Sequence, residues 1–201
     1  MEKFKLCFWL NVPSPHQEAL LIELNKDSNV DLVVRYFAKQ DSQRLKIGWE
    51  NNNSLKPYEK QVESKDKAFI EMEDWKERIH ITTGFGFEFN KYLLPILIKN
   101  KVKWVHWSER FGLVLATKLK FNICLFNLLR PIYLITKRDY ATMVNKYALG
   151  CFSQGYLAKK DFIDSGIKED KIQHLFYSIN FKKNEMTTKE STKIKDKKSF
   201  L

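Results

Sequence analysis

Residues 151–179 read CFSQGYLAKKDFIDSGIKEDKIQHLFYSI, and this stretch decides the fold class. A short apolar run ends at Gly155, and a helical pattern then runs as far as Gly166. Glycine after the last periodic residue is a common helix stop. A second apolar run follows at 173–178. Strand, helix and strand in immediate succession predict one complete αβ unit.

The same alternation is repeated upstream. Strands are predicted at residues 4–10, 31–37, 78–83, 102–107 and 149–153, with helices at 15–26, 88–99 and 156–164. Before the first helix, Ser14 is the expected N-cap, Pro15 the first helical residue and Gln17 the reciprocal partner of a capping box. The repetition predicts an α/β fold, a Rossmann-like three-layer sandwich with a mostly parallel sheet and right-handed crossovers.

Two regions depart from this alternation. Residues 38–75 are interpreted as an irregular insertion with short strands at 45–49 and 68–72 and a turn at 51–53. Residues 111–147 are apolar and helical in propensity, and Pro131 is expected to break or kink them into two helices.

The end of the chain has a different composition. Residues 182–201 hold seven Lys and three acidic residues with few apolar side chains, which is typical of a linker. We therefore expect one domain at residues 1–181 and a Lys-rich linker at 182–201.

Composition narrows the function classes. The formal net charge of +11 favours an anionic partner, either nucleotide phosphates, a lipid surface or nucleic acid. Cys7, Cys124 and Cys151 are odd in number and have apolar neighbours, which indicates reduced thiols in a cytoplasmic protein rather than disulfides or a metal site. The apolar run 6–10 is too short for a signal peptide.

Candidate site residues follow from the parallel sheet. Ligands of such sheets bind beyond the carboxyl ends of the strands, where helix N-termini present free amides. Three junctions have this form, at residues 12–17, 82–87 and 153–156. Gly84 and Gly86 lack the third glycine of a dinucleotide fingerprint, so a classical dinucleotide site is not expected.

Two side chains at this edge could perform chemistry. His16, in the first turn of its helix, could donate to a phosphate or act as a base, or it could simply face solvent. Glu109 follows the strand at 102–107 and could bind a hydroxyl, or it could pair with Arg110 or cap a helix. His80 alternates with isoleucines in a strand and is interpreted as a packed residue. The aromatic residues Phe85, Phe87, Phe89 and Tyr92 are interpreted as core.

Basic side chains interrupt the most apolar region of the chain. Lys118, Lys120 and Arg130 lie among Leu, Ile and Phe, so residues 111–135 do not read as a membrane span. Apolar anchors with flanking cations are what an interfacial helix needs, and these three residues are predicted to face a membrane. The alternative is a core helix with a solvated basic face.

Together, these features resemble a known family. The loop Pro13-Ser14-Pro15-His16-Gln17 is similar to the P-S-P-[HY]-Q loop of family 4-like bacterial glycosyltransferases with the GT-B fold. The stretch 151–179 resembles the end of their N-terminal domain. The resemblance implies a domain that receives the acceptor and faces a second domain that binds a nucleotide-sugar. It implies acceptor-side roles for residues 14–17, 83–85 and 107–110. Within these segments we expect His16 and Glu109 to be catalytic, and the residues expected to bind acceptor or donor are Ser14, Pro15, Gln17, Thr83, Gly84, Phe85, Trp107, Ser108 and Arg110.

The chain also departs from that family. It stops at 198–201, where the first strand of the second domain would begin, and the paired glutamates of that domain are missing. The chain alone is then expected to be inactive, as a truncated gene product, an expressed fragment or one half of a two-chain enzyme.

The resulting expectation is the acceptor-binding half of a glycosyltransferase. It would move a sugar from a nucleotide-sugar to a polysaccharide or lipid-linked acceptor at the cytoplasmic face of a membrane, with no metal and no cofactor beyond the donor. A C-terminal domain or partner chain would complete it. The rival interpretation is a non-catalytic Rossmann-like module that docks on an anionic membrane or a partner subunit. Nucleic-acid binding is not expected, because no reading element accompanies the lysines.

Overall fold

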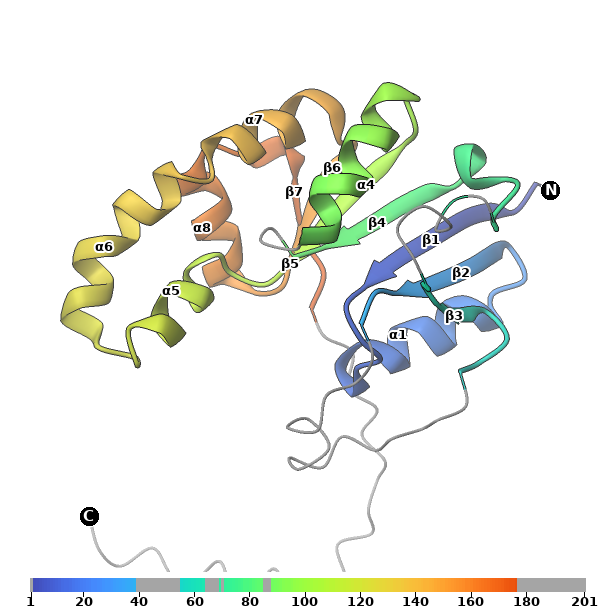
Figure 1. Ribbon diagram of the computed structural model, residues 1–201, viewed down its shortest axis with the longest axis horizontal. Helices are drawn as coiled ribbons and strands as arrows, with labels where there is room; N and C mark the ends of the chain where they lie inside the picture. The colour runs from blue at the N-terminus through green and yellow to red at the C-terminus, as the bar shows by residue number, and fades with distance from the viewer. Residues whose placement is uncertain (1, 39–54, 64–68, 70, 85–87, 177–201) are drawn as a thin grey trace, which may run out of the picture.

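The computed structural model of the chain describes residues 2–38, 55–63, 69, 71–84 and 88–176 (Figure 1). Seven strands form one sheet in the order β3-β2-β1-β4-β5-β6-β7, and every neighbouring pair is parallel. The strands are β1 (Phe4–Leu10), β2 (Val30–Tyr36), β3 (Glu59–Gln61), β4 (Ile79–Thr83), β5 (Trp104–Ser108), β6 (Gly150–Ser153) and β7 (Ile172–His174). This arrangement confirms the predicted α/β, Rossmann-like fold.

Helices cover both faces of the sheet. They are α1 (Pro15–Lys26), α4 (Glu88–Lys99), α5 (Gly112–Lys118), α6 (Ile123–Ile135), α7 (Arg138–Tyr147) and α8 (Tyr156–Ser165). Short 3-10 turns, η1 (Trp75–Glu77) and η2 (Glu169–Lys171), precede β4 and β7. The helix α1 lies on one face and α4, α7 and α8 lie on the other (Figure 1).

Strand alternation divides the core in two. Phe8 and Leu10 of β1 pack with Leu21 of α1, whereas Cys7 and Trp9 of the same strand pack with residues of α4, α7 and α8. Successive side chains of a strand point to opposite faces, so a central strand that is covered on both sides needs the continuous apolar run found in β1. This produces the three layers.

Several predicted boundaries agree with the structure. The bounds of β1, α1 and α4 match the predicted ranges, and those of the other predicted strands differ by a residue or two, apart from β7, which ends earlier. The capping box is wrong. Ser14 has the extended backbone of an N-cap, but its side chain makes no capping hydrogen bond; its carbonyl instead accepts from the amides of Gln17 at 3.0 Å and Glu18 at 3.1 Å.

The region 38–75 contains the strand β3, which the sequence pattern did not predict. The polar tripeptide of β3 pairs with β2, and Tyr36 Oη donates to Glu59 at 3.0 Å while Gln61 Nε2 donates to the carbonyl of Tyr36 at 2.8 Å. The strand predicted at 68–72 is wrong for its described residues: Phe69 is helical, and Phe69 and Met72 are core side chains. The strand at 45–49 and the turn at 51–53 lie outside the described residues.

Pro131 does not divide the long apolar segment. It lies inside α6, and the divisions occur instead at Lys120 and Phe121, which have φ of 49° and 59°, and at Thr136. The ring of Pro131 deprives the carbonyl of Asn127 of its helical donor, but Asn127 is exposed and water can replace that bond. Three helices therefore stand where two were predicted.

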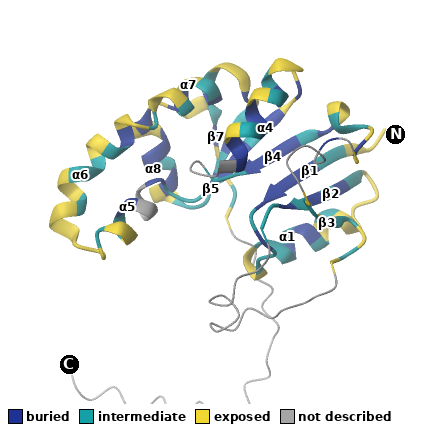
Figure 2. Cartoon of the chain, in the orientation of Figure 1, coloured by how far each residue is buried: buried dark blue, intermediate teal, exposed yellow. Residues whose placement is uncertain are grey.

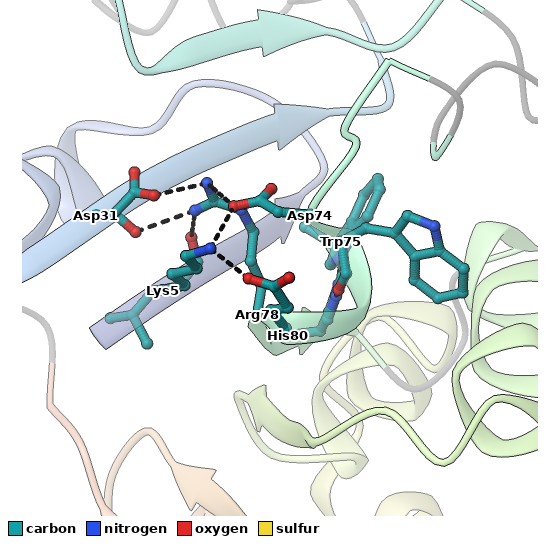
Figure 3. Close-up of polar contacts among 9 residues, drawn as sticks. Lys5, Asp31, Asp74, Trp75, Arg78 and His80 are labelled. Carbon is teal, nitrogen blue, oxygen red and sulfur yellow. Dashed lines mark hydrogen bonds and ion pairs between the residues drawn. The ribbon is translucent and has the colours of Figure 1, made fainter. Parts of the chain in front are cut away.

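A closed polar network joins the amino ends of the strands (Figure 3). Arg78, whose side chain is 6% exposed, donates to Asp31 at 2.8 Å and to Asp74 at 2.8 Å and 2.9 Å. It also reaches the carbonyls of Leu6 at 3.3 Å and Asp31 at 3.1 Å. Partial burial alone would raise the pKa of Asp74, but hydrogen bonds from Arg78 and Lys5 hold that pKa below its ordinary value.

His80 is a packed residue, in agreement with its interpretation. Its Nδ1 accepts from Trp9 Nε1 at 2.7 Å, so Nε2 carries the proton and donates to the carbonyl of Trp75 at 2.7 Å. Burial lowers the pKa of His80 to about 4. The ring is therefore neutral at physiological pH and serves the core.

Candidate functional site

The strand order has its topological switch point between β1 and β4. We call the carboxyl ends of these two strands, with the loops that follow them, the β1–β4 crevice. The chain runs outward from β1 through β2 to β3, then returns to the other side of β1 and continues from β4 to β7. The loops after β1 and β4 consequently leave the sheet in opposite directions. In open parallel sheets, ligands bind at the carboxyl ends of the strands at such a switch point.

The loop after β1 presents the N-terminus of α1 at this crevice. Val12 is buried, Ser14 and Gln17 are half-buried, and Pro15 and His16 are exposed. No side chain caps the helix, but the amides of Gln17 and Glu18 already donate to the carbonyl of Ser14, so what this turn offers an anion is the positive end of the helix dipole. His16 stands in this first turn, where its imidazole can donate to a phosphate oxygen or accept a proton from a hydroxyl.

The end of β4 is held by Thr83, which the sequence analysis names as a site residue, and by Asn90, which it does not. Thr83 Oγ1 donates to the carbonyl of Trp9 at 2.9 Å, which ties β4 to β1 at the crevice. Asn90, only 2% exposed in α4, donates to the carbonyls of Thr83 at 2.8 Å and Gly84 at 2.6 Å. Gly84 has φ of 74°, a left-handed conformation that favours glycine. Phe85 lies outside the described residues.

The end of β5 contributes one core residue and two rim residues. Trp107 is 1% exposed and packs edge-on against Phe8 at 6.0 Å between ring centroids, so it supports the sheet from below the rim. Ser108 and Glu109 are half-buried at the end of the strand. Both β1 and β5 flank β4, and strands are about 4.8 Å apart, so the ends that carry His16 and Glu109 are roughly 10 Å from each other.

Arg110 belongs to an ionic cluster rather than to an open rim. Its Nε lies 3.3 Å from Asp161 Oδ2, and its guanidinium stacks on Phe126 at 5.3 Å. Asp161 is 1% exposed and also binds Arg130 at 2.6 Å. The cluster joins α6 to α8, and a buried carboxylate between two guanidinium groups is the arrangement that burial of charge requires.

A second buried polar group lies behind the crevice. His106, which is fully buried in β5, has its Nδ1 3.0 Å from Tyr140 Oη and 3.5 Å from Thr82 Oγ1. Burial lowers the pKa of His106 to about 3, and burial raises the pKa of Tyr140. Both groups are therefore neutral, and the cluster supports the strands instead of exchanging protons with a ligand.

The three residues predicted to face a membrane do not share one environment. Lys118 and Lys120 are exposed at the end of α5. Arg130 is 18% exposed and is paired with Asp161 and with Asp164, each at 2.6 Å. Within the described residues, no helix is long and apolar enough to cross a membrane. No cluster of His, Cys, Asp or Glu there could hold a metal ion.

An open cavity lies at the opposite edge of the sheet. Its volume is about 610 Å³, and it is lined at the amino ends of β1 and β2 by residues that include Lys3, Lys5 and Asp31. The helices that follow β1, β4 and β6 begin at the other edge, and Lys5 is already paired with Asp74 at 3.3 Å and with Glu77. The carboxyl edge is therefore the better candidate for a ligand site.

Comparisons with known proteins bear on the fold. No protein-family model matches the chain, and no curated protein matches it. Among solved structures, the chain is similar to Alr3699/HepE of Anabaena, determined in complex with UDP and glucose, with a TM-score of 0.51 and 8% sequence identity. The similarity covers 86% of this chain and 44% of HepE. The two proteins share a fold, and this chain spans less than half of the length of HepE.

Proposed function

We propose that the chain is the acceptor-side half of a GT-B glycosyltransferase of the family 4-like type. It receives a saccharide or lipid-linked acceptor and supports transfer of a sugar from a nucleotide-sugar that an opposing domain or partner chain binds. The observation that carries the proposal is the topological switch point between β1 and β4, where α1 begins without a side-chain cap and His16 is exposed in its first turn. The fold shared with a protein that binds UDP and glucose supports it.

The proposed chemistry needs few groups from this half. The acceptor hydroxyl must lose a proton as it attacks the anomeric carbon of the donor, and the diphosphate must leave with its negative charge stabilised. His16 is suited to the first task or to contact with a phosphate, and the positive end of the α1 dipole is suited to the second. Glu109 can accept a hydrogen bond from an acceptor hydroxyl and orient it.

A transfer assay tests this proposal. The chain is supplied together with a donor-binding domain, in one polypeptide or as a second chain, and transfer of radiolabelled glucose from UDP-glucose to saccharide acceptors is measured. We expect His16→Ala and Glu109→Ala each to lower the rate by about 100-fold. Glu23→Ala, which removes an exposed carboxylate at the far end of α1, is the matched control. Unchanged rates in both site variants would remove them from the site.

A second candidate function is docking on an anionic membrane, and the surface of α6 favours it. Figure 2 shows that α6 is mostly exposed. Apolar side chains recur along it at helical spacing, with exposed fractions of 40% for Leu125, 68% for Leu128, 61% for Ile132 and 54% for Ile135, and Phe121, just before the helix, is 67% exposed. We call these residues the α6 stripe. Such a contiguous exposed apolar face is uncommon on a soluble domain.

Charge complements the α6 stripe. Residues 110–138 contain lysine and arginine but neither aspartate nor glutamate. Lys118 and Lys120 lie at one end, and Lys137 lies at the other, where partial burial and the charge of Lys118 lower its pKa. An interfacial helix buries its apolar face at the headgroup boundary while cations meet anionic lipid. Arg130, held by Asp161, is not part of this surface in our proposal.

Vesicle co-sedimentation tests docking separately from catalysis. We expect the chain to sediment with phosphatidylglycerol vesicles at low salt and less at high salt, and to ignore phosphatidylcholine vesicles. Leu128→Asp/Ile132→Asp should abolish sedimentation, and Lys118→Ala/Lys120→Ala should weaken it by about tenfold or more. Phe4→Asp, which alters an exposed apolar residue on β1, is the control. Equal sedimentation of all variants would contradict docking through α6.

A further inference from the structure

Three exposed aromatic side chains meet at the carboxyl ends of β6 and β7. Tyr156 begins α8 and is 75% exposed, His174 ends β7, and Phe176 follows it with 51% exposure. The ring centroids of Tyr156 and His174 are 5.0 Å apart, those of His174 and Phe176 are 5.4 Å apart, and those of Tyr156 and Phe176 are 5.9 Å apart. We call these three residues the aromatic platform.

The structure orients these rings. His174 and Phe176 are nearly parallel, with 12° between their planes, and Tyr156 stands at 65° and 62° to them. Ser153, which is fully buried, lies with its Oγ 3.0 Å from His174 Nδ1 and thereby fixes the imidazole plane. Gly155, with φ of 96°, allows the turn that brings Tyr156 to the platform. The rings therefore form a defined surface before any ligand arrives.

The aromatic platform also has unused polar atoms. Within the described part of the chain, neither Tyr156 Oη nor His174 Nε2 has a hydrogen-bond partner. Apolar ring faces with a few convergent polar groups are typical of small-molecule sites. A pyranose ring offers the same combination, because its axial C–H groups form an apolar face and its hydroxyls lie around the rim.

The surroundings select a neutral ligand. The two segments that build the aromatic platform, residues 150–156 and 172–176, contain no Asp, Glu, Lys or Arg. The N-terminus of α8 also lies at the platform, since the helix begins at Tyr156, but these two segments supply no cation to pair with the phosphates of a nucleotide. A neutral saccharide requires only ring faces and hydrogen-bonding groups, which are present.

We infer that the aromatic platform is a saccharide subsite that holds a neutral sugar ring by stacking. It lies at the same edge of the sheet as the β1–β4 crevice, beyond β5, so a bound oligosaccharide could extend from one to the other. The inference rests on the proposed function in taking the ligand to be the acceptor. Binding by the aromatic platform does not require turnover, and the two can be tested apart.

The test is binding of neutral oligosaccharides to the whole chain. Maltohexaose and cellohexaose are the probes, measured by saturation-transfer NMR and titration, with UMP as the competing nucleotide. We expect Tyr156→Ala and Phe176→Ala each to weaken oligosaccharide binding by about three- to tenfold. Tyr156→Phe should restore the stacking and lose only the hydroxyl contribution. Phe121→Ala, which removes an aromatic ring of the α6 stripe, is the control, since that ring is exposed to a similar degree at 67%.

The results of the binding experiment test the saccharide subsite separately from the proposed function. Loss of oligosaccharide binding in the platform variants but not in Phe121→Ala supports the subsite. Binding that survives both platform substitutions, absence of binding by the unmodified chain, or competition by UMP for these rings would each overturn it. None of these results depends on His16 or Glu109, so the transfer assay still decides the proposed function independently. The substituted rings are largely exposed, and thermal unfolding verifies that the variants fold.

Discussion

The two edges of the sheet treat their polar groups in opposite ways. At the amino edge, Arg78 is buried and donates to two carboxylates and two backbone carbonyls. At the carboxyl edge, α1 begins without a side-chain cap, His16 is exposed, and Tyr156 Oη has no partner among the described residues. Buried and paired groups at the amino edge contribute to stability, and exposed polar groups at the carboxyl edge are within reach of a ligand. Changes at the amino edge and in the core should therefore affect folding, and changes at the carboxyl edge should affect function.

Acid should give the largest effect on folding. Burial lowers the pKa values of His80 and His106 to about 4 and about 3, below the ordinary value of about 6.5, so the unfolded chain binds more protons between these values. Stability from the neutral rings is therefore complete above pH 6.5 and is lost as the pH falls. Between pH 7 and pH 5, we expect the free energy of unfolding to fall by about 4 kcal/mol in total from these two rings.

Urea unfolding at several pH values measures this dependence. His106→Gln removes one titrating ring, so its stability should fall less steeply between pH 7 and pH 5 than that of the unmodified chain. Equal slopes for the unmodified chain and His106→Gln would show that the buried ring does not resist protonation.

Loss of the hydrogen-bond network around Arg78 should have the second-largest effect on the free energy of unfolding. Arg78→Ala removes the guanidinium group that donates to the carboxylates of Asp31 and Asp74 and to two backbone carbonyls. We expect the free energy of unfolding to fall by about 3 kcal/mol. Lys26→Ala breaks an exposed pair with Glu23 at the same edge and should cost less than about 0.5 kcal/mol. Chemical denaturation at pH 7 compares the two, and similar losses would mean that the network adds nothing beyond a surface pair.

Loss of the hydrogen bonds that Asn90 donates at the end of β4 should have an intermediate effect on the free energy of unfolding. Asn90→Asp keeps the shape of the side chain but cannot donate to the carbonyls of Thr83 and Gly84, so we expect a loss of about 2 kcal/mol. Asn100→Asp, which alters an exposed amide at the end of α4, is a matched control with a small expected effect. If both variants unfold at the same urea concentration, Asn90 does not hold the loop.

The smallest folding effect is expected at the open edge. His16→Ala should change the free energy of unfolding by less than about 0.5 kcal/mol, because the side chain is exposed. The same substitution is expected to lower sugar transfer in the assay described above. If the variant lost stability as well as transfer, His16 would contribute to folding as Arg78 does, and the division between a stabilising amino edge and a functional carboxyl edge would be weaker.

Local sequence patterns were sufficient for much of the fold. The continuous apolar run of β1, the Ser-Pro start of α1 and the glycine stop of α8 are signals that act within a few residues, and each element lies where its pattern predicts. By contrast, β3 has no apolar pattern and exists because the edge of β2 offers it hydrogen bonds. Pro131 was misjudged because an exposed helix tolerates a missing backbone bond.

The candidate site was predictable only in part. The positions of His16, Gly84 and Glu109 after strands follow from the parallel alternation alone. The burial of Trp107 and the ion pairs that hold Arg110 and Arg130 do not, because each depends on a partner far along the chain.

The amino-acid sequence by itself determined the alternation of strands and helices, and with it the parallel sheet, because hydrophobic periodicity and helix-end chemistry are local. Only the tertiary structure decided which polar groups are buried and paired and which are exposed. Asp161 binds Arg130 of α6, and His174 meets Tyr156 of α8. The physical reason is that burial, pairing and exposure of a side chain are set by neighbours in space, which the order of strands in the sheet brings together.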